Sequence, residues 1–256
     1  NQFTGDSKYI DVLERSMYNG ALAGVSLAGD RFFYVNPLVS NGDHHRQAWY
    51  GCACCPSQIS RFLPSIGNYI YGTSDKALWV NLFIGNTTEV TIDGKKVVMK
   101  QETDYPWDGL VKLTVTSEQP LGKELRIRIP GWCKSYTLSV NGNKVDSTTD
   151  KGYTVIKEWK TGDLIVLNMD MPVEKVSADP RVRQNTGKRA LQRGPLVYCL
   201  EETDNAKDFA DLALTPTRSK TNRTTWVASS QSKPYRMDKH YISFLTMPGT
   251  TAKQAR

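Results

Sequence analysis

The amino-acid sequence predicts a mainly β protein that begins with helices, and two observations support this fold class. Apolar residues recur at helical spacing over residues 1–75, and from residue 76 they recur at the two-residue spacing of half-buried strands. The later strands are short and are separated by turn sequences rather than by helices. This order is typical of helices followed by antiparallel β-sandwich layers.

Two amphipathic helices are predicted in the first part of the chain. Residues 6–24 have apolar side chains at three- and four-residue steps, and residues 56–72 repeat the pattern more clearly. Pro56 suits the first helical position, whereas Pro64 lies inside the pattern and is expected to kink the helix. Two such helices cannot bury both apolar faces alone, so we expect them to be the last members of a larger helical array.

Alternating residues then predict a series of strands, at 78–84, 89–92, 111–115, 125–129, 153–156, 164–167, 190–191 and 196–200. Asp93-Gly94, Asn141-Gly142 and Gly194-Pro195 provide turn sequences between strands. A further turn at residues 161–163 predicts that the strands on either side of it pair with each other.

Three consecutive parts follow from these patterns. Residues 1–75 are predicted to form the terminal helices and a cysteine-containing loop, and residues 76–178 a β-sandwich. Residues 179–256 are predicted to form a second, smaller β region that ends in a frayed tail from Pro248.

Charge and hydropathy restrict the possible partners. The net charge of +7 arises from residues 181–256, which carry 14 basic and 6 acidic side chains, against 19 and 20 in residues 1–180. These basic residues are scattered without a nucleic-acid motif, so we expect a solvated basic face and no nucleic-acid partner. No apolar run approaches the length of about 18 residues that suggests a membrane span, and none is expected.

The beginning of the chain has neither an initiator methionine nor the basic and apolar regions of a signal peptide. We therefore interpret the sequence as an excised fragment. Its compartment is not predicted, and both the periplasm and the cytoplasm are compatible with it.

The cysteine cluster Cys52-Ala53-Cys54-Cys55 is the strongest chemical feature, because three thiols occur within four positions immediately before Pro56. A helix start favours thiolate, and clustered thiolates can bind zinc. Asp43, His44, His45 and His240 are possible further ligands. Simple packing of small thiols is the alternative, and a Cys-x-x-Cys redox pair would require a βαβ context that the sequence does not have.

Four segments resemble glycoside hydrolase family 127, the β-L-arabinofuranosidase type. They are residues 32–38 (FFYVNPL), 46–50 (RQAWY), 54–61 (CCPSQISR) and 190–198 (ALQRGPLVY). The paired cysteines and proline at the start of a helix are the most specific element. Ser57 and Gln58 depart from the commoner Pro-Asn after this motif.

The resemblance implies that the helices are the end of an (α/α)6 barrel followed by β-sandwich domains. It also implies retaining hydrolysis of terminal β-L-arabinofuranosyl units, with Cys54 as a zinc-bound nucleophile and Cys55 as a further zinc ligand. The family's other ligands, a glutamate and a cysteine two residues apart, and its acid/base glutamate would lie in a missing N-terminal barrel domain. No Glu-x-Cys occurs in this sequence.

Several further expectations follow from the residues and from the resemblance together. The fragment is predicted to be inactive alone, and the whole protein to act on an arabinose-containing oligosaccharide or glycan. Tyr34 is a candidate substrate-binding residue, and Cys52 has no assigned role. Cys133 and Cys199 are predicted to be small buried side chains. The alternative function is a non-catalytic β-sandwich module that binds carbohydrate or supports a catalytic partner domain.

Overall fold

The computed structural model describes residues 1–35, 43–52, 54–118, 122–198, 213–218, 224–230 and 233–234, the last three ranges as backbone only. The chain forms two compact units that interleave along the sequence. The first unit contains residues 1–16 and 56–171, and the second contains residues 17–55 and 172–256. The division into three consecutive parts stays a prediction.

The predicted first helix changes its helix type along its length. α1 spans Lys8–Ser16, the π-helical segment η1 spans Met17–Ala21, and the 3₁₀ segment η2 spans Leu22–Gly24. Ile10 and Glu14 are the buried residues of α1. An acidic side chain on the buried face of a helix requires a partner, which the sequence pattern did not reveal.

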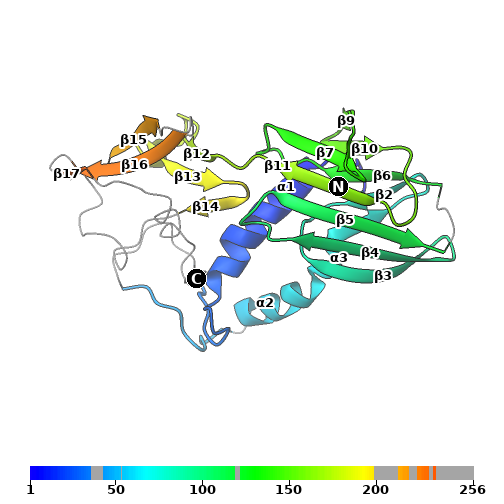
Figure 1. The fold of residues 1–256 in the computed structure, drawn as a ribbon. Helices are drawn as coiled ribbons and strands as arrows, with labels where there is room; N and C mark the ends of the chain where they lie inside the picture. Colours follow the sequence, from blue (N-terminus) through cyan, green and yellow to red (C-terminus); the bar gives the residue numbers. More distant parts are fainter. Residues whose placement is uncertain are drawn as a thin grey trace, which may run out of the picture. The chain divides into compact units, whose positions relative to one another are not determined.

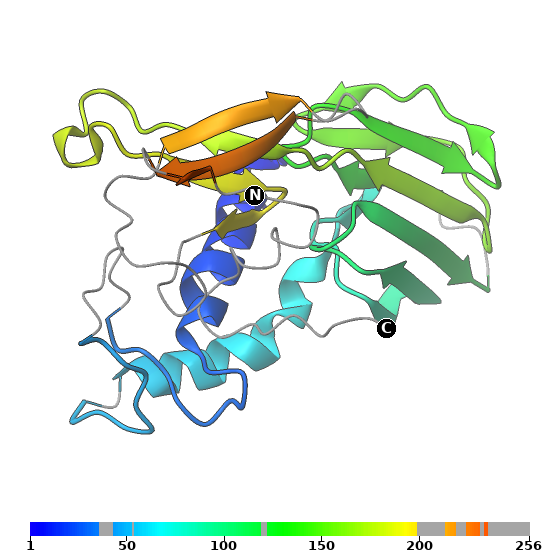
Figure 2. The same cartoon turned by 60° about the vertical axis from the view of Figure 1, so that its left-hand side comes forward.

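The second predicted helix is divided near its proline. α2 spans Cys54–Ser65 and α3 spans Gly67–Ile70, both drawn in cyan in Figure 2. Pro64 lacks an N–H group and its ring clashes with the preceding turn, so α2 ends one residue later. The helical pattern predicted to Gly72 is too long, because Tyr71–Thr73 already form strand β1.

The first unit contains two sheets, and most of their strands are labelled in Figure 1. One sheet has the order β1-β2-β6-β10-β9, with β2 at Ala77–Val80, β6 at Glu124–Arg128, β10 at Tyr153–Ile156 and β9 at Thr149–Asp150. The other has the order β3-β4-β5-β11-β7-β8, with strands at Asn86–Ile92, Lys95–Thr103, Leu110–Ser117, Leu164–Met169, Tyr136–Val140 and Asn143–Lys144. All these pairs are antiparallel except β2 with β6.

The turns Asp93-Gly94 and Asn141-Gly142 are confirmed as two-residue hairpin turns between β3 and β4 and between β7 and β8. Both residues of each turn have positive φ, between 51° and 81°. This is the type I′ geometry that an Asn-Gly or Asp-Gly pair adopts with little strain.

The predicted pairing of residues 153–156 with residues 164–167 is wrong. β10 pairs with β6 and β9 in one sheet, whereas β11 pairs with β5 and β7 in the other. The intervening residues are too many for a tight hairpin and carry the chain from one sheet to the other. Trp159 donates its indole N–H to the carbonyl of Lys123 over 2.8 Å, and Gly162 donates to that of Val115 over 2.9 Å.

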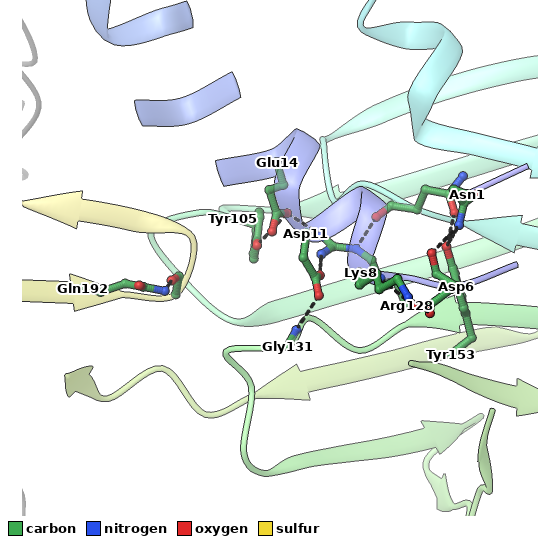
Figure 3. Close-up of polar contacts among 12 residues, drawn as sticks. Asn1, Asp6, Lys8, Asp11, Glu14, Tyr105, Arg128, Gly131, Tyr153 and Gln192 are labelled. Atoms are coloured by element: carbon green, nitrogen blue, oxygen red, sulfur yellow. Dashed lines mark hydrogen bonds and ion pairs between the residues drawn. The ribbon is translucent and has the colours of Figure 1, made fainter. Parts of the chain in front are cut away.

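A buried arginine joins α1 to the strands of the first unit, as Figure 3 shows. The Arg128 guanidinium donates to a carboxylate oxygen of Asp11 over 2.6 Å and to one of Glu14 over 2.5 Å. Its Nε also donates to the carbonyl of Asn81 over 2.5 Å, and Tyr105 donates to Glu14 over 2.8 Å. The side chains of Arg128 and Glu14 are 0% and 2% exposed, so this ion pair is shielded from water.

Burial opposes the positive charge of Arg128, but the carboxylates beside it outweigh that effect and raise its pKa. The cation is therefore retained in the folded unit. Arg128 belongs to β6, and its side chain binds carboxylates of α1, which lies more than a hundred residues earlier in the sequence.

The second unit contains two three-stranded antiparallel sheets. β12 at Val173–Val176, β13 at Ala190–Arg193 and β14 at Leu196–Tyr198 form one, with the predicted turn Gly194-Pro195 between the last two. The other consists of β15 at Ala213–Arg218, β16 at Thr224–Ser230 and β17 at Lys233–Pro234. A short 3₁₀ segment, η3, spans Arg183–Asn185.

Asn19 fixes the helical segment η1 to the β13–β14 hairpin within this unit. Its side-chain N–H donates to the carbonyl of Pro195, and its carbonyl oxygen accepts the N–H of Val197, both over 2.8 Å. The predicted tail from Pro248 and Cys199 lie outside the described residues.

The prediction of a mainly β chain with N-terminal helices and largely antiparallel sheets is confirmed. In the part of the chain that the structure describes, no helix has the length and apolarity needed to cross a bilayer.

Candidate active site at the cysteine cluster

Residues 32–34 of the second unit form a short segment, called the strap below, that places Tyr34 beside the cysteine cluster. Phe32 and Gln47 exchange two backbone hydrogen bonds of 3.0 Å, and Phe33 donates its N–H to Gly24 over 2.9 Å. Tyr50 donates its hydroxyl to the carbonyl of Phe32 over 3.2 Å, and its ring lies 5.7 Å from that of Tyr34. These contacts fix the backbone on the N-terminal side of Tyr34.

Arg46 also supports this strap. Its guanidinium lies 4.3 Å from the centre of the Phe33 ring and donates to the carbonyl of Ala23 over 2.8 Å. Arg46 had no predicted role, because no local signal in the sequence indicates which ring or carbonyl a single arginine will contact.

The three cysteines lie at the start of α2, which begins two residues earlier than predicted. Cys54 and Cys55 are its first two residues, and Cys52 precedes it. The N–H groups of the first helical turn have no partner within the helix and carry the positive end of its dipole. Cys52 and Cys54 are exposed, and Cys55 is half-buried.

The sulfur atoms are close together, and Tyr34 contacts the cluster. The Cys54 sulfur lies 3.4 Å from the Tyr34 hydroxyl, 3.4 Å from the Cys52 sulfur and 3.7 Å from the Cys55 sulfur. The Cys55 thiol points toward the carbonyl of Tyr34 at 3.9 Å. The predicted site residues Tyr34, Cys54 and Cys55 therefore lie together.

The neighbouring groups shift the pKa values of Cys54 and Cys55 in opposite directions. The hydrogen bond with Tyr34, followed by those with Cys52 and Cys55, lowers the pKa of Cys54. Burial raises the pKa of Cys55. The same contact with Cys54 raises the pKa of the Tyr34 phenol, which consequently stays a proton donor. Cys54 is thus the thiol that most easily becomes a nucleophilic thiolate.

Two of these thiols fit the geometry of a zinc site. With Zn–S bonds of about 2.3 Å, two thiolates on one tetrahedral zinc have their sulfur atoms about 3.8 Å apart. Cys54 and Cys55 have a sulfur–sulfur distance of 3.7 Å. Among the described residues, no group of three or more histidine, cysteine, aspartate or glutamate side chains is arranged to hold a metal. The cysteine pair can therefore supply two ligands but not a complete site.

His44, one of the histidines considered as further ligands, is engaged elsewhere. The His44 ring stacks on Phe33 with ring centres 4.9 Å apart, and its Nε2 lies 2.6 Å from the carbonyl of Val35. The Trp49 side chain is exposed.

Cys133 differs from its prediction as a small buried strand residue. It is half-buried, lies after β6 in a turn, and donates to the carbonyl of Ser135 over 3.2 Å. Burial raises the pKa of its thiol to about 11, so Cys133 is a poor nucleophile at neutral pH.

Three family models match the chain in succession. Residues 1–68 match the β-L-arabinofuranosidase GH127 catalytic domain, residues 77–171 match the GH127 middle domain, and residues 173–244 match the glycoside hydrolase family 127 C-terminal domain. The chain belongs to glycoside hydrolase family 127. The cysteine cluster lies within the segment that matches the catalytic domain.

Similar proteins from bacteria support this family membership. A non-reducing end β-L-arabinofuranosidase from Bifidobacterium longum subsp. longum is 40% identical over 221 residues, which are 79% of this chain and 33% of that protein. A crystal structure of a GH127 β-L-arabinofuranosidase from Geobacillus stearothermophilus T6 has 41% identity and a TM-score of 0.78, covering 93% of this chain and 42% of that one.

A second solved structure, described as a GH127 β-arabinofuranosidase, has 38% identity and a TM-score of 0.80, and the match covers 89% of this chain and 40% of that one. The present chain therefore spans between a third and a half of the length of these family members.

Replacing Tyr34 with phenylalanine should slow the alkylation of Cys54. The change removes the leading cause of the lowered Cys54 pKa, so that pKa rises and the thiolate fraction at neutral pH falls. Above the ordinary thiol pKa of 9.0, both proteins should react at similar rates, because Cys54 is then ionised in each. The measurement is the rate of iodoacetamide labelling of Cys54 against pH, followed by peptide mass spectrometry.

Tyr69→Phe is the matched control for this experiment, since Tyr69 is exposed and lies in α3, outside the cysteine cluster. It should leave the pH profile unchanged. An unchanged profile in Tyr34→Phe would contradict the assignment.

Proposed function

We propose that this chain is the C-terminal part of a retaining glycoside hydrolase that removes terminal β-L-arabinofuranosyl units. Cys54 is the nucleophile, and Cys54 and Cys55 are zinc ligands. The observation that carries the proposal is the position of Cys54, whose exposed sulfur lies against the Tyr34 hydroxyl and 3.7 Å from a second thiol.

The chemistry at Cys54 is a double displacement. Its sulfur attacks the anomeric carbon, a C–S bond forms, and the glycosidic C–O bond breaks. Water then attacks the same carbon and releases Cys54, so that two inversions give net retention. Zinc, when bound, holds the sulfur deprotonated and aims it.

Tyr34 has two roles in this proposal. Its hydroxyl directs the Cys54 sulfur through their 3.4 Å contact. The residue is 38% exposed, and its aromatic ring can bind the apolar side of a furanose. We retain it as a substrate-binding residue. The substrate is then an arabinose-containing oligosaccharide or glycan with a free non-reducing end.

The remaining site groups must come from elsewhere in the protein. A carboxylic acid has to protonate the departing oxygen and later activate water, and two further ligands would complete the zinc site. We propose that a preceding segment supplies them and that α1, α2 and α3 are the last helices of its (α/α)6 barrel. The 256-residue chain alone should therefore hydrolyse no arabinofuranoside.

The two sheets of the first unit would then form a β-sandwich that supports these helices. The buried contacts of Arg128 with Asp11 and Glu14 favour such a role, because they join a helix of the catalytic segment to the middle domain. A supporting function for the sheets is the second candidate, and it is compatible with the first.

Zinc analysis of the protein that includes the preceding segment tests the proposal. We expect one zinc per chain by elemental analysis, and loss of that zinc in Cys55→Ala. Cys133→Ala is the matched control and should keep its zinc, since this thiol lies in the first unit rather than in the cluster. Metal-free protein in every preparation would refute the zinc-bound nucleophile.

A further inference from the structure

The proposed function uses two of the three clustered thiols and leaves Cys52 without a role. Cys52 lies 3.4 Å from Cys54, sulfur to sulfur, and its thiol donates a hydrogen bond to that sulfur. This separation is shorter than the 3.7 Å between Cys54 and Cys55. Cys52 is exposed and precedes the first residue of α2.

We infer that Cys52 is a resolving thiol that forms a reversible disulfide with Cys54 when a peroxide oxidises Cys54. The consequence for hydrolysis, a reversible loss of activity that spares the nucleophile, rests on the proposed function. The disulfide itself does not, because it requires only the two thiols and the oxidant.

The geometry favours Cys52 over Cys55 as the partner of Cys54. A disulfide has an S–S bond of about 2.05 Å, so the Cys52 and Cys54 sulfurs must approach each other by about 1.4 Å. Cys52 lies outside the helix and can move without breaking a helical turn. Cys54 and Cys55 are adjacent residues of α2, and a bond between them would close a strained ring within its first turn.

The exposure of the thiols also favours this pair. Cys52 and Cys54 are both exposed to a small oxidant, whereas Cys55 is half-buried. Cys133 is half-buried and belongs to the other unit, with its thiol directed at the carbonyl of Ser135.

The chemistry is balanced with hydrogen peroxide as the oxidant. The Cys54 thiolate attacks one peroxide oxygen, an S–O bond forms, the O–O bond breaks, and the departing hydroxide takes up a proton to become water. The Cys52 sulfur then attacks the Cys54 sulfur, an S–S bond forms, and the S–O bond breaks. The released hydroxide leaves as a second water with the Cys52 proton, so two thiols lose two electrons to one peroxide.

Without Cys52, the sulfenic acid on Cys54 has no favourable intramolecular partner. It then reacts with a second peroxide to give sulfinic acid, which ordinary thiol reductants do not reverse. Cys52 would therefore convert an irreversible loss of the Cys54 thiol into a reversible one.

The test oxidises the 256-residue chain with hydrogen peroxide after treatment with a chelator. Remaining thiols are then alkylated, and each cysteine is assigned by fragment mass spectrometry. In the wild type we expect Cys52 and Cys54 to be protected from alkylation, Cys55 and Cys133 to be alkylated, and dithiothreitol to restore both protected thiols. In Cys52→Ser, Cys54 should gain two oxygen atoms and resist restoration.

Cys55→Ser is the matched control, and it should form the Cys52–Cys54 disulfide as the wild type does. The inference is overturned if Cys52→Ser still loses two thiols together, which would indicate a Cys54–Cys55 bond. It is also overturned if Cys54 in the wild type is oxidised as irreversibly as in Cys52→Ser.

A second arm uses the protein that includes the preceding segment, in which the proposed zinc site would be complete. It adds zinc before the peroxide and separates this inference from the proposed function. Zinc bound by Cys54 and Cys55 should slow the appearance of the disulfide. If zinc has no effect and the disulfide still forms, the inference stands and the proposed zinc ligands are wrong. If no disulfide forms without zinc, the inference fails irrespective of the zinc result.

Discussion

Replacing Cys54 with alanine in the protein that includes the preceding segment should reduce hydrolysis of a terminal β-L-arabinofuranoside by on the order of 10³-fold or more. The alanine has no atom that can attack the anomeric carbon, so the covalent route is lost entirely. The measurement is kcat and KM with a chromogenic β-L-arabinofuranoside. We expect the loss in kcat, because Tyr34 and the rest of the sugar site stay in place.

Two controls make this result specific. Cys133→Ala should retain activity, because this thiol has a pKa of about 11 and donates to the carbonyl of Ser135, away from the cysteine cluster. Cys52→Ser should also retain activity in reducing buffer, since Cys52 is neither the nucleophile nor a zinc ligand in the proposal. Turnover by Cys54→Ala close to that of the unmodified enzyme would exclude Cys54 as the nucleophile.

Local sequence signals predicted the local parts of the fold correctly. The alternation of residues 111–115 and the Asp93-Gly94 turn correspond to β5 and the β3–β4 hairpin. Both signals depend on neighbouring residues alone, namely burial of alternate side chains and the positive φ that a type I′ turn requires. The start of α2 at the paired cysteines was located to within two residues.

Long-range relationships were not available from the sequence. β10 and β11 look like a hairpin along the chain but belong to different sheets, because their partners are decided by packing rather than by the turn between them. The proximity of Tyr34 to Cys54 likewise depends on the strap pairing between Phe32 and Gln47. No spacing rule connects a tyrosine to a cysteine twenty positions later.

Arg128 shows most clearly what alternation misses. In β6, Leu125 and Ile127 alternate with Arg126 and Arg128, which predicts that both arginines face solvent. Arg126 has a side chain that is 20% exposed, but Arg128 is completely buried. The reason is that α1 brings two carboxylates to this end of the strand, and its sequence lies more than a hundred residues away.

Replacing Arg128 with methionine should destabilise the first unit by about 3–5 kcal/mol, because it leaves the Glu14 carboxylate buried without its cation. Methionine fills much of the aliphatic volume, so lost packing contributes less than the unpaired charge. The measurement is urea unfolding of the 256-residue chain followed by tryptophan fluorescence. The free energies of unfolding are compared on condition that their slope against urea concentration is the same in the variant and the wild type.

Arg126→Met is the matched control, because Arg126 also contacts two carboxylates, those of Glu124 and Asp150, but at the surface. Exposed pairs contribute little, so this change should cost about 1 kcal/mol or less. Adding Glu14→Gln to Arg128→Met should recover part of the lost stability, since a neutral amide can still accept the Tyr105 hydrogen bond. Equal costs for Arg128→Met and Arg126→Met would show that burial of the ion pair does not decide its contribution to the stability of the unit.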